Sequence, residues 1–257
     1  MPAIETAALT KRYDSTTAVR ELDLSVAEGT VYGFLGPNGS GKTTTMRMLT
    51  GLTTPTSGTA IVAGVPVTDR DRLRPHIGYL PEEPPLYEQA TAYEQLEYVA
   101  GLRDLPSPET EERIDTLLEQ LDLTPDDATT RIADYSKGMR QKVAYVQAVL
   151  HEPDVAFLDE PTSGLDPRAA RTIREMIRTL ADGGTTVFLS THILPVVEAV
   201  ADRIGILYDG TLVAEDTPER LTHRAETGET RTLEDAFLEL TSTDPADVTR
   251  ESETLDG

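Results

Sequence analysis

The sequence predicts an α/β fold, and three observations carry this prediction. Segments with the apolar spacing of helices separate short apolar runs that are typical of buried strands. The apolar run at residues 30–35 is followed directly by a glycine-rich loop and then by a helical segment. Strands that alternate with helices in this way form layered α/β folds. The apolar runs lie at residues 30–35, 77–80, 155–158, 185–190 and 203–208.

The N-terminal part is expected to form a small antiparallel β subdomain. Residues 4–35 alternate apolar segments with turn signals such as Glu28-Gly29. Residues 59–65 are a further short apolar run that predicts a strand.

The middle of the chain is expected to be helical. Apolar residues recur at i, i+3 and i+4 within residues 91–105 and 109–121. Ser136 suits the N-cap of a further helix that ends at Leu150. We therefore expect residues 82–150 to form an α-helical subdomain inserted into the α/β core.

The C-terminal half returns to strands alternating with helices. Asp166-Pro167 is a strong helix start, and that helix is expected to end at the glycines at 183–184. A shorter helix is predicted at 194–201. We expect residues 1–240 to form one domain and residues 241–257, which are polar and acidic, to form a disordered tail.

The charge of the 257-residue chain is strongly negative and unevenly distributed. The formal net charge is −22; residues 1–81 hold 8 basic and 7 acidic side chains, whereas residues 82–134 hold 3 and 15. Nucleic-acid backbones are bound by clustered lysine and arginine, so this composition argues against a nucleic-acid partner. Only four lysines occur beside 19 arginines. Acidic, lysine-poor surfaces are typical of halophilic proteins, and the alternative is an ordinary acidic soluble protein.

Two classes of feature are absent from the sequence. There are no cysteines, which excludes disulfides, thiolate metal sites and a cysteine nucleophile. The first residues lack the basic and apolar regions of a signal peptide, and no run approaches the roughly 18 apolar residues of a membrane span. We expect any role at a membrane to depend on a partner protein.

The most informative motif is the glycine-rich loop, which matches the phosphate-binding pattern G-x-x-x-x-G-K-[ST]. Glycines bring backbone N–H groups close to phosphate oxygens, the lysine contacts the β- and γ-phosphates, and the hydroxyl of the last residue can hold Mg²⁺. A strand precedes the loop and a helix from about Thr44 to Leu49 follows it, as this chemistry requires. The predicted fold class is therefore a P-loop NTPase core with an N-terminal antiparallel β subdomain and an inserted α-helical subdomain. The loop consists of Gly36, Pro37, Asn38, Gly39, Ser40, Gly41, Lys42 and Thr43.

A pair of carboxylates follows another buried strand. Asp159 and Glu160 come directly after the apolar run at 155–158, at the strand end where α/β sheets place their ligands. We expect Asp159 to hold Mg²⁺ and Glu160 to polarise the water that attacks the γ-phosphate.

Five motifs in one order make the chain similar to the ATP-binding subunits of ABC transporters over about residues 4–240. These motifs are the loop at 36–43, the segment 135–139 (Tyr-Ser-Lys-Gly-Met), Asp159-Glu160-Pro161, the segment 163–166 (Ser-Gly-Leu-Asp) and His192. The resemblance implies that Tyr13 stacks on adenine and that His192 contacts the γ-phosphate. It also implies that Thr44, directly after the loop, contacts ATP. By the same resemblance, residues 163–166 cross to a second subunit.

The chain departs from the usual family pattern at two places. The signature is usually Leu-Ser-Gly-Gly-Gln, and here Ser136 and Gly138 are retained while Lys137 separates them. By the resemblance, Ser136 and Gly138 bind the ATP held by the other subunit. The family usually has a glutamine that touches Mg²⁺ where this chain has Glu82. Both variants, and residues 232–241, resemble ATPases that serve ABC-2-type export permeases.

The resemblance implies an ATPase that uses ATP and Mg²⁺ and works as a dimer, most simply a homodimer. A separate integral-membrane permease would hold it at the cytoplasmic face of the cell membrane, where ATP hydrolysis powers export. The helical lobe and the bend at 81–86 would dock on the permease. The alternative function is a soluble regulatory or assembly ATPase without a transport partner. A DNA-maintenance ATPase is disfavoured, because the chain lacks long coiled coils and has the wrong charge.

Overall fold

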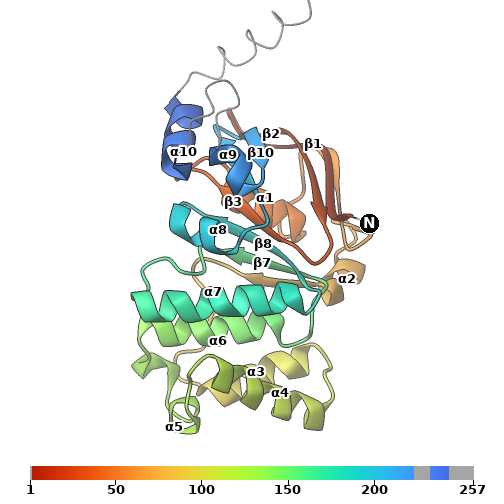
Figure 1. The fold of residues 1–257 in the computed structure, drawn as a ribbon. Coiled ribbons are helices and arrows are strands. Elements are labelled where there is room, and N and C mark those ends of the chain that lie inside the picture. The colour runs from red at the N-terminus through yellow and green to blue at the C-terminus, as the bar shows by residue number, and fades with distance from the viewer. Residues whose placement is uncertain (1, 223–231, 243–257) are drawn as a thin grey trace, which may run out of the picture.

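The computed structural model describes residues 2–222 and 232–242. These residues form two sheets and surrounding helices, stacked in the layers seen in Figure 1. The α/β fold predicted from the sequence is confirmed.

A six-stranded sheet lies at the centre of the molecule, with the strand order β10-β9-β3-β8-β7-β6. Five strands run parallel, and the edge strand β10 is antiparallel to β9. All residues of β3, β7 and β8 are buried, because other elements cover both faces of the sheet. The bounds are Val31–Leu35 (β3), Ile77–Leu80 (β6), Val155–Asp159 (β7), Thr186–Thr191 (β8), Arg203–Tyr208 (β9) and Thr211–Asp216 (β10).

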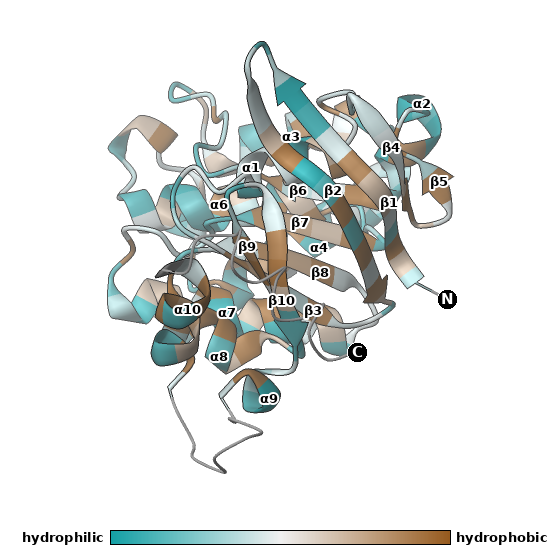
Figure 2. Cartoon of the chain, turned by 90° about the horizontal axis from the view of Figure 1, so that it is seen from above, coloured by the Kyte–Doolittle hydropathy of each residue, from teal (hydrophilic) through white to brown (hydrophobic). Residues whose placement is uncertain are grey.

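A four-stranded antiparallel sheet of order β2-β1-β4-β5 covers one face of the central sheet. Hydrophobic and hydrophilic residues alternate along β1 and β2 (Figure 2), because one face of this sheet packs inward and the other meets solvent. Helix α1 (Lys42–Leu49) contributes Met46, Met48 and Leu49 to the same apolar cluster. The strand bounds are Pro2–Tyr13 (β1), Thr16–Ala27 (β2), Ser57–Val62 (β4) and Val65–Pro66 (β5).

Helices cover the other face of the central sheet. Figure 1 shows α6 and α7 side by side beneath the sheet, with α3 and α4 beyond them. Ile173, Met176 and Ile177 on α7 are buried, as their spacing predicted. The bounds are Ala92–Leu102 (α3), Ser107–Gln120 (α4), Pro125–Ala128 (α5), Lys137–Val149 (α6), Pro167–Asp182 (α7) and Leu194–Val200 (α8).

Two predicted helix caps are confirmed. The Ser136 hydroxyl accepts a hydrogen bond from the backbone N–H of Met139 at 3.2 Å and begins α6. Asp166 accepts from the backbone N–H groups of Arg168 and Ala169 at 3.0 and 3.1 Å and begins α7. Both caps satisfy N–H groups that have no partner inside the helix.

The structure corrects several predicted boundaries. Helix α1 begins at Lys42 rather than Thr44, because Gly41 turns the chain with a φ of 108° and leaves Lys42 in the first helical turn. The predicted tail begins two residues too early, since α10 runs to Ser242 and packs Phe237 and Leu240 on the core. The rest of that tail lies outside the described residues. The sequence analysis also missed β10 and the helices Arg70–Leu73 (α2), Pro218–Thr222 (α9) and Leu233–Ser242 (α10).

Within residues 2–222 and 232–242, no helix combines the length and the apolar character that crossing a bilayer requires.

Candidate active site

The glycine-rich loop joins β3 to α1, and close backbone contacts require glycine at two of its positions, Gly36 and Gly41. A Cβ atom on Gly36 would lie 2.4 Å from the carbonyl oxygen of Leu207. A Cβ atom on Gly41 would lie 2.3 Å from the carbonyl oxygen of Ala18, and the φ of 108° also disfavours other residues. The loop is therefore held against β9 and β2 by backbone that only glycine can approach this closely.

The loop borders a cavity of about 330 Å³. The cavity opens at the N-terminus of α1, where backbone N–H groups and the helix dipole favour an anion. Six of the twelve predicted nucleotide-binding residues line it, together with two acidic residues from distant segments. The lining residues are Ala18, Asn38, Gly39, Gly41, Lys42, Thr43, Thr44, Glu82 and Glu160.

Lys42 is the cationic group of this cavity, and its side chain is only 7% exposed. Its Nζ donates hydrogen bonds to the carbonyl oxygens of Gly36 at 2.7 Å and Pro37 at 3.2 Å. It also lies 4.0 Å from Oε1 of Glu160. Burial lowers the pKa of Lys42, and the carboxylates of Glu160, Asp159 and Glu82 oppose that shift. The ammonium is thus placed at the meeting point of the loop and three acidic side chains.

Asp159 is the last residue of β7 and is 1% exposed. Its Oδ1 accepts a hydrogen bond from the hydroxyl of Ser190 at 2.5 Å. Its Oδ2 is buried and has no hydrogen-bond partner among the described residues. A buried carboxylate oxygen without a partner is costly, so this atom is suited to bind a cation.

Glu160 follows with a φ of 49°, a left-handed conformation that costs a non-glycine residue about 1–3 kcal/mol. The turn directs the side chain into the cavity, where it is only 6% exposed. Its Oε2 accepts from the hydroxyl of Thr191 at 2.9 Å, and its Oε1 lies 2.8 Å from Nδ1 of His192. The strained backbone and the two side-chain contacts together hold one orientation of the carboxylate.

Ser190 and Thr191 were missed by the sequence analysis, which singled out only His192, the residue that follows their strand. Strands β7 and β8 are parallel neighbours, and Asp159 pairs with Ser190 in their register. The two hydroxyls at the carboxyl end of β8 therefore reach the two carboxylates at the end of β7. The sequence did contain a signal for these contacts, because polar residues that end two buried strands of a parallel sheet meet at the same edge of that sheet.

The remaining predicted site residues lie outside the cavity lining. Tyr13 ends β1, is 45% exposed and has Lys11 Nζ 4.9 Å from its ring centre. It belongs to the β1–β2 hairpin, which contributes Ala18 to the cavity. Ser40 is buried within the loop, and its hydroxyl has no partner among the described residues. Ser136 is exposed and Gly138 is half-buried at the start of α6, and neither lines this cavity.

Comparison with known proteins agrees with this geometry. The family model described as "ABC transporter" matches residues 19–163. The daunorubicin resistance ATP-binding protein DrrA3 of Streptomyces coeruleorubidus is 41% identical over 85% of this chain and 68% of its own length. The chain spans only 61% and 41% of the length of two other curated relatives that it matches.

The solved structures that resemble this chain also include ATP-binding proteins of ABC transporters. The ATP-binding subunit of an ABC transporter superposes with a TM-score of 0.84 and 32% identity, covering 93% of this chain and 99% of the other. A dimeric post-hydrolysis state of the ATP-binding cassette MJ0796, bound to ADP and Pi, has a TM-score of 0.76 and 25% identity, covering 83% and 98%. The segment that matches the family model, residues 19–163, contains both the glycine-rich loop and the Asp159-Glu160 pair. This chain therefore belongs to the ABC transporter family, of which it is an ATP-binding domain.

Proposed function

We propose that this chain binds ATP with Mg²⁺, hydrolyses it as a dimer and thereby powers an exporter whose permease is a separate membrane protein. The convergence of Lys42 and Glu160 on one cavity, with the buried Asp159 directly before Glu160, carries this proposal. Each group suits one task of phosphoryl transfer: charge neutralisation, metal binding and water activation.

Lys42 and the loop are proposed to bind the phosphates. The carbonyl oxygens of Gly36 and Pro37 hold the ammonium at the edge of the cavity, so a phosphate meets a cation that is already in position. The N–H groups at the start of α1 add further donors. On the exposed β1–β2 hairpin, Tyr13 would stack on the adenine ring.

The oxygen atoms around the cavity fit a Mg²⁺ ion, which prefers carboxylate, hydroxyl and phosphate ligands. The unpartnered Oδ2 of Asp159 and the hydroxyl of Thr43 would hold it, and Glu82 supplies a further carboxylate where the family usually has an amide. When bound, the ion would neutralise charge on the phosphates. Glu82 adds negative charge, so this site depends on its cation more strongly than a glutamine site would.

Glu160 is proposed as the general base. A base must hold its lone pair toward the attacking water, and Thr191 and His192 orient this carboxylate by contacting one oxygen each. The ammonium of Lys42 lies 4.0 Å from Oε1 of this carboxylate and places an opposite charge beside the proposed base. His192 would also contact the γ-phosphate from its half-exposed position beside Glu160.

A second copy of the chain is proposed to complete each site. Ser136 and Gly138 begin α6 away from the cavity of their own chain, and a helix N-terminus binds phosphate well. In a dimer they would meet the γ-phosphate held by the other copy, while residues 163–166 cross the interface. The ADP-bound dimer of the MJ0796 cassette supports this arrangement.

The permease, the direction of transport and the location at the cytoplasmic membrane face are part of the same proposal. The name of the Streptomyces relative associates that protein with drug resistance, which supports export. The helical lobe formed by α3, α4 and α5 is the surface proposed to dock on the permease.

The substitution Glu160→Gln tests the proposal. It removes the base while keeping the shape, so hydrolysis should fall about 1,000-fold. ATP should still bind and should hold the protein as a dimer, which light scattering after size-exclusion chromatography would detect. Normal turnover in this variant would show that Glu160 is not the base.

The matched control is Glu198→Gln, which makes the same chemical change at an exposed position on α8. Its hydrolysis and its ATP-dependent dimerisation should equal those of the unaltered protein. A similar loss of activity in both variants would point to a general effect of charge rather than to a catalytic role of Glu160.

A further inference from the structure

Lys11, near the end of β1, contacts both the ring of Tyr13 and the loop at residues 50–56, which follows α1. Its Nζ lies over the Tyr13 ring, 4.9 Å from the ring centre. The same ammonium donates a hydrogen bond to the carbonyl oxygen of Thr54 at 2.8 Å. One side chain therefore covers a face of the tyrosine and ties the end of β1 to a second segment of the chain.

The loop that receives this hydrogen bond is itself held by backbone contacts on both sides. The N–H of Thr53 donates to the carbonyl oxygen of Arg47 on α1 at 2.9 Å. The N–H of Thr56 donates to the carbonyl oxygen of Thr10 on β1 at 2.8 Å. Because the loop is bonded to a helix and to a strand, the carbonyl oxygen of Thr54 is a fixed anchor for the ammonium.

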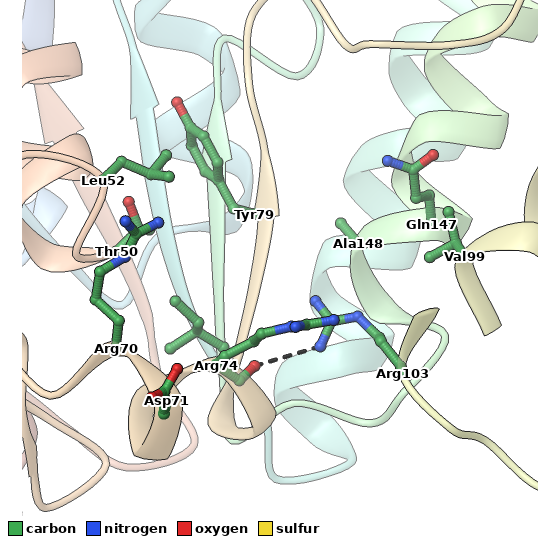
Figure 3. A pocket seen from close by; sticks show the side chains of 11 residues that line it. Thr50, Leu52, Arg70, Asp71, Arg74, Tyr79, Val99, Arg103, Gln147 and Ala148 are labelled. Carbon is green, nitrogen blue, oxygen red and sulfur yellow. Dashed lines mark hydrogen bonds between the residues drawn. The ribbon is translucent and has the colours of Figure 1, made fainter. Parts of the chain in front are cut away.

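Two residues of the same loop line a groove of about 450 Å³ between the central core and the helical lobe. Figure 3 shows Thr50 and Leu52 on one side of this groove and Val99 of α3 on the other. Neither Lys11 nor Tyr13 belongs to the lining of this groove or of the phosphate cavity. A substitution of Lys11 therefore removes no side chain from either hollow.

The positive charge of Lys11 is available to the tyrosine ring. In the part of the chain that the structure describes, no carboxylate forms an ion pair with this ammonium. The faces of an aromatic ring carry a negative potential, so a cation placed over one face is attracted to it. With its Nζ fixed by Thr54, Lys11 favours one orientation of the Tyr13 ring.

This contact decides which face of Tyr13 can receive a flat ligand. The ammonium occupies one face, and the side chain is 45% exposed, so a base would stack on the opposite face. Two aromatic rings placed face to face repel each other electrostatically, because both faces are negative. A cation behind the tyrosine draws electron density toward itself and thereby weakens this repulsion on the far face.

We propose that Lys11 positions Tyr13 for the adenine ring of ATP, by holding one face of the tyrosine and leaving the opposite face for the base. The inference rests on the function proposed above and adds a positioning residue to it, since Lys11 acts through Tyr13 and does not contact the nucleotide. Two lysines then serve opposite ends of one ligand, with Lys42 at the phosphates and Lys11 behind the base.

The test compares ATP with inorganic tripolyphosphate, which carries the phosphates and has no base. Isothermal titration calorimetry with the full chain should show that Lys11→Met weakens ATP binding about fivefold and leaves tripolyphosphate binding unchanged. Methionine keeps an unbranched side chain but removes the charge and the donor. Lys11→Arg keeps both and should bind ATP nearly as well as the unaltered protein. Lys142→Met makes the same change on α6 and is the matched control, which should bind both ligands as before.

A double-substitution cycle with Tyr13 separates positioning from other effects of the charge. Tyr13→Ala alone should weaken ATP binding about tenfold, because the base loses its stacking partner. Adding Lys11→Met to Tyr13→Ala should cause no further loss, because the lysine acts only through the ring. A lysine that attracted phosphate directly, or that only supported the β1–β2 hairpin, would still weaken binding when the ring is absent.

Several results would overturn the inference. They are an unchanged ATP affinity in Lys11→Met, an equal loss for ATP and tripolyphosphate, and a loss that persists in the Tyr13→Ala background. An unchanged ATP affinity in Tyr13→Ala would overturn it as well, together with the stacking role of Tyr13.

The two proposals fail separately. If Glu160→Gln did not dimerise with ATP, the proposed function would fail, and the base-dependent loss in Lys11→Met could still be observed. If Glu160→Gln dimerised normally and Lys11→Met bound ATP like the unaltered protein, only the role of Lys11 would be lost.

Discussion

The phosphate cavity and a second hollow, a groove of about 450 Å³ lined by residues of the core and of the helical lobe, have opposite electrostatic designs. In the cavity, Lys42 lies with the carboxylates of Glu82 and Glu160, and the buried carboxylate of Asp159 also acts on its charge. In the groove, Arg70, Arg74 and Arg103 have no carboxylate partner among the described residues. Strand β6 contributes Ile77 and Tyr79 to the groove and ends just before Glu82.

The difference lies in how each hollow holds its charges. The cavity fixes its charges in position through internal contacts, so it suits a ligand that needs exact placement for chemistry. The groove leaves its guanidinium groups without a carboxylate partner among the described residues, and Leu52 on its wall is 51% exposed. The predictions below test this contrast, from the largest expected effect to the smallest.

Lys42→Ala should weaken ATP binding about 100-fold, because it removes a charge-assisted contact with phosphate and leaves Glu160 and Asp159 without their buried counter-charge. Isothermal titration calorimetry would measure the affinity. Lys142→Ala on α6 is the control and should bind ATP as before. Unchanged affinity in Lys42→Ala would remove the main distinction between the two hollows, since the cavity would no longer need its cation.

The burial of His151 should make folding sensitive to acid. The folded-state pKa of His151, about 4, lies below its usual value of 6.5, chiefly because of burial, so the unfolded chain binds the proton more tightly. Stability from this group is present above pH 6.5 and is lost as the pH falls toward 4, amounting to about 2 kcal/mol between pH 7 and pH 5. Urea unfolding at both pH values should show a smaller loss for His151→Gln. Parallel curves for the two proteins would show that His151 does not carry this sensitivity.

Thr191→Val should lower the rate of hydrolysis about tenfold, because it leaves Oε2 of Glu160 without its donor. The expected signature is a lower kcat with little change in ATP affinity, as the residue positions the base and does not contact phosphate. Thr116→Val is the control, since that hydroxyl bonds only to Glu112 of its own helix. Equal rates in both variants would mean that His192 and the backbone are sufficient to orient Glu160.

Potassium chloride should strengthen ATP-driven dimerisation. Two copies of a chain with a net charge of −22 repel each other, so dimerisation should strengthen severalfold from low to molar salt. Hydrolysis rates that are equal at low and molar salt, with the fold intact, would count against the role given to surface repulsion.

Much of the nucleotide site could be predicted from the sequence because its chemistry is local. The loop at 36–43 and the pair Asp159-Glu160 are contiguous, and each follows an apolar strand whose end must lie at the sheet edge. The starts of α6 and α7 were predictable for the same reason, since Ser136 and Asp166 cap the helices that they precede. In all these cases, the residues that decide the structure are neighbours in the chain.

Tertiary structure alone decided the features that depend on residues far apart in the sequence. The contacts of Ser190 with Asp159 and of Thr191 with Glu160 required the order of β7 and β8 in the sheet, which no local pattern encodes. The left-handed backbone conformation of Glu160 could not be predicted, because the position is not occupied by glycine. The groove needed the packing of the lobe against the core, because only that packing brings Arg74 and Arg103 together from segments that are otherwise unremarkable in the sequence.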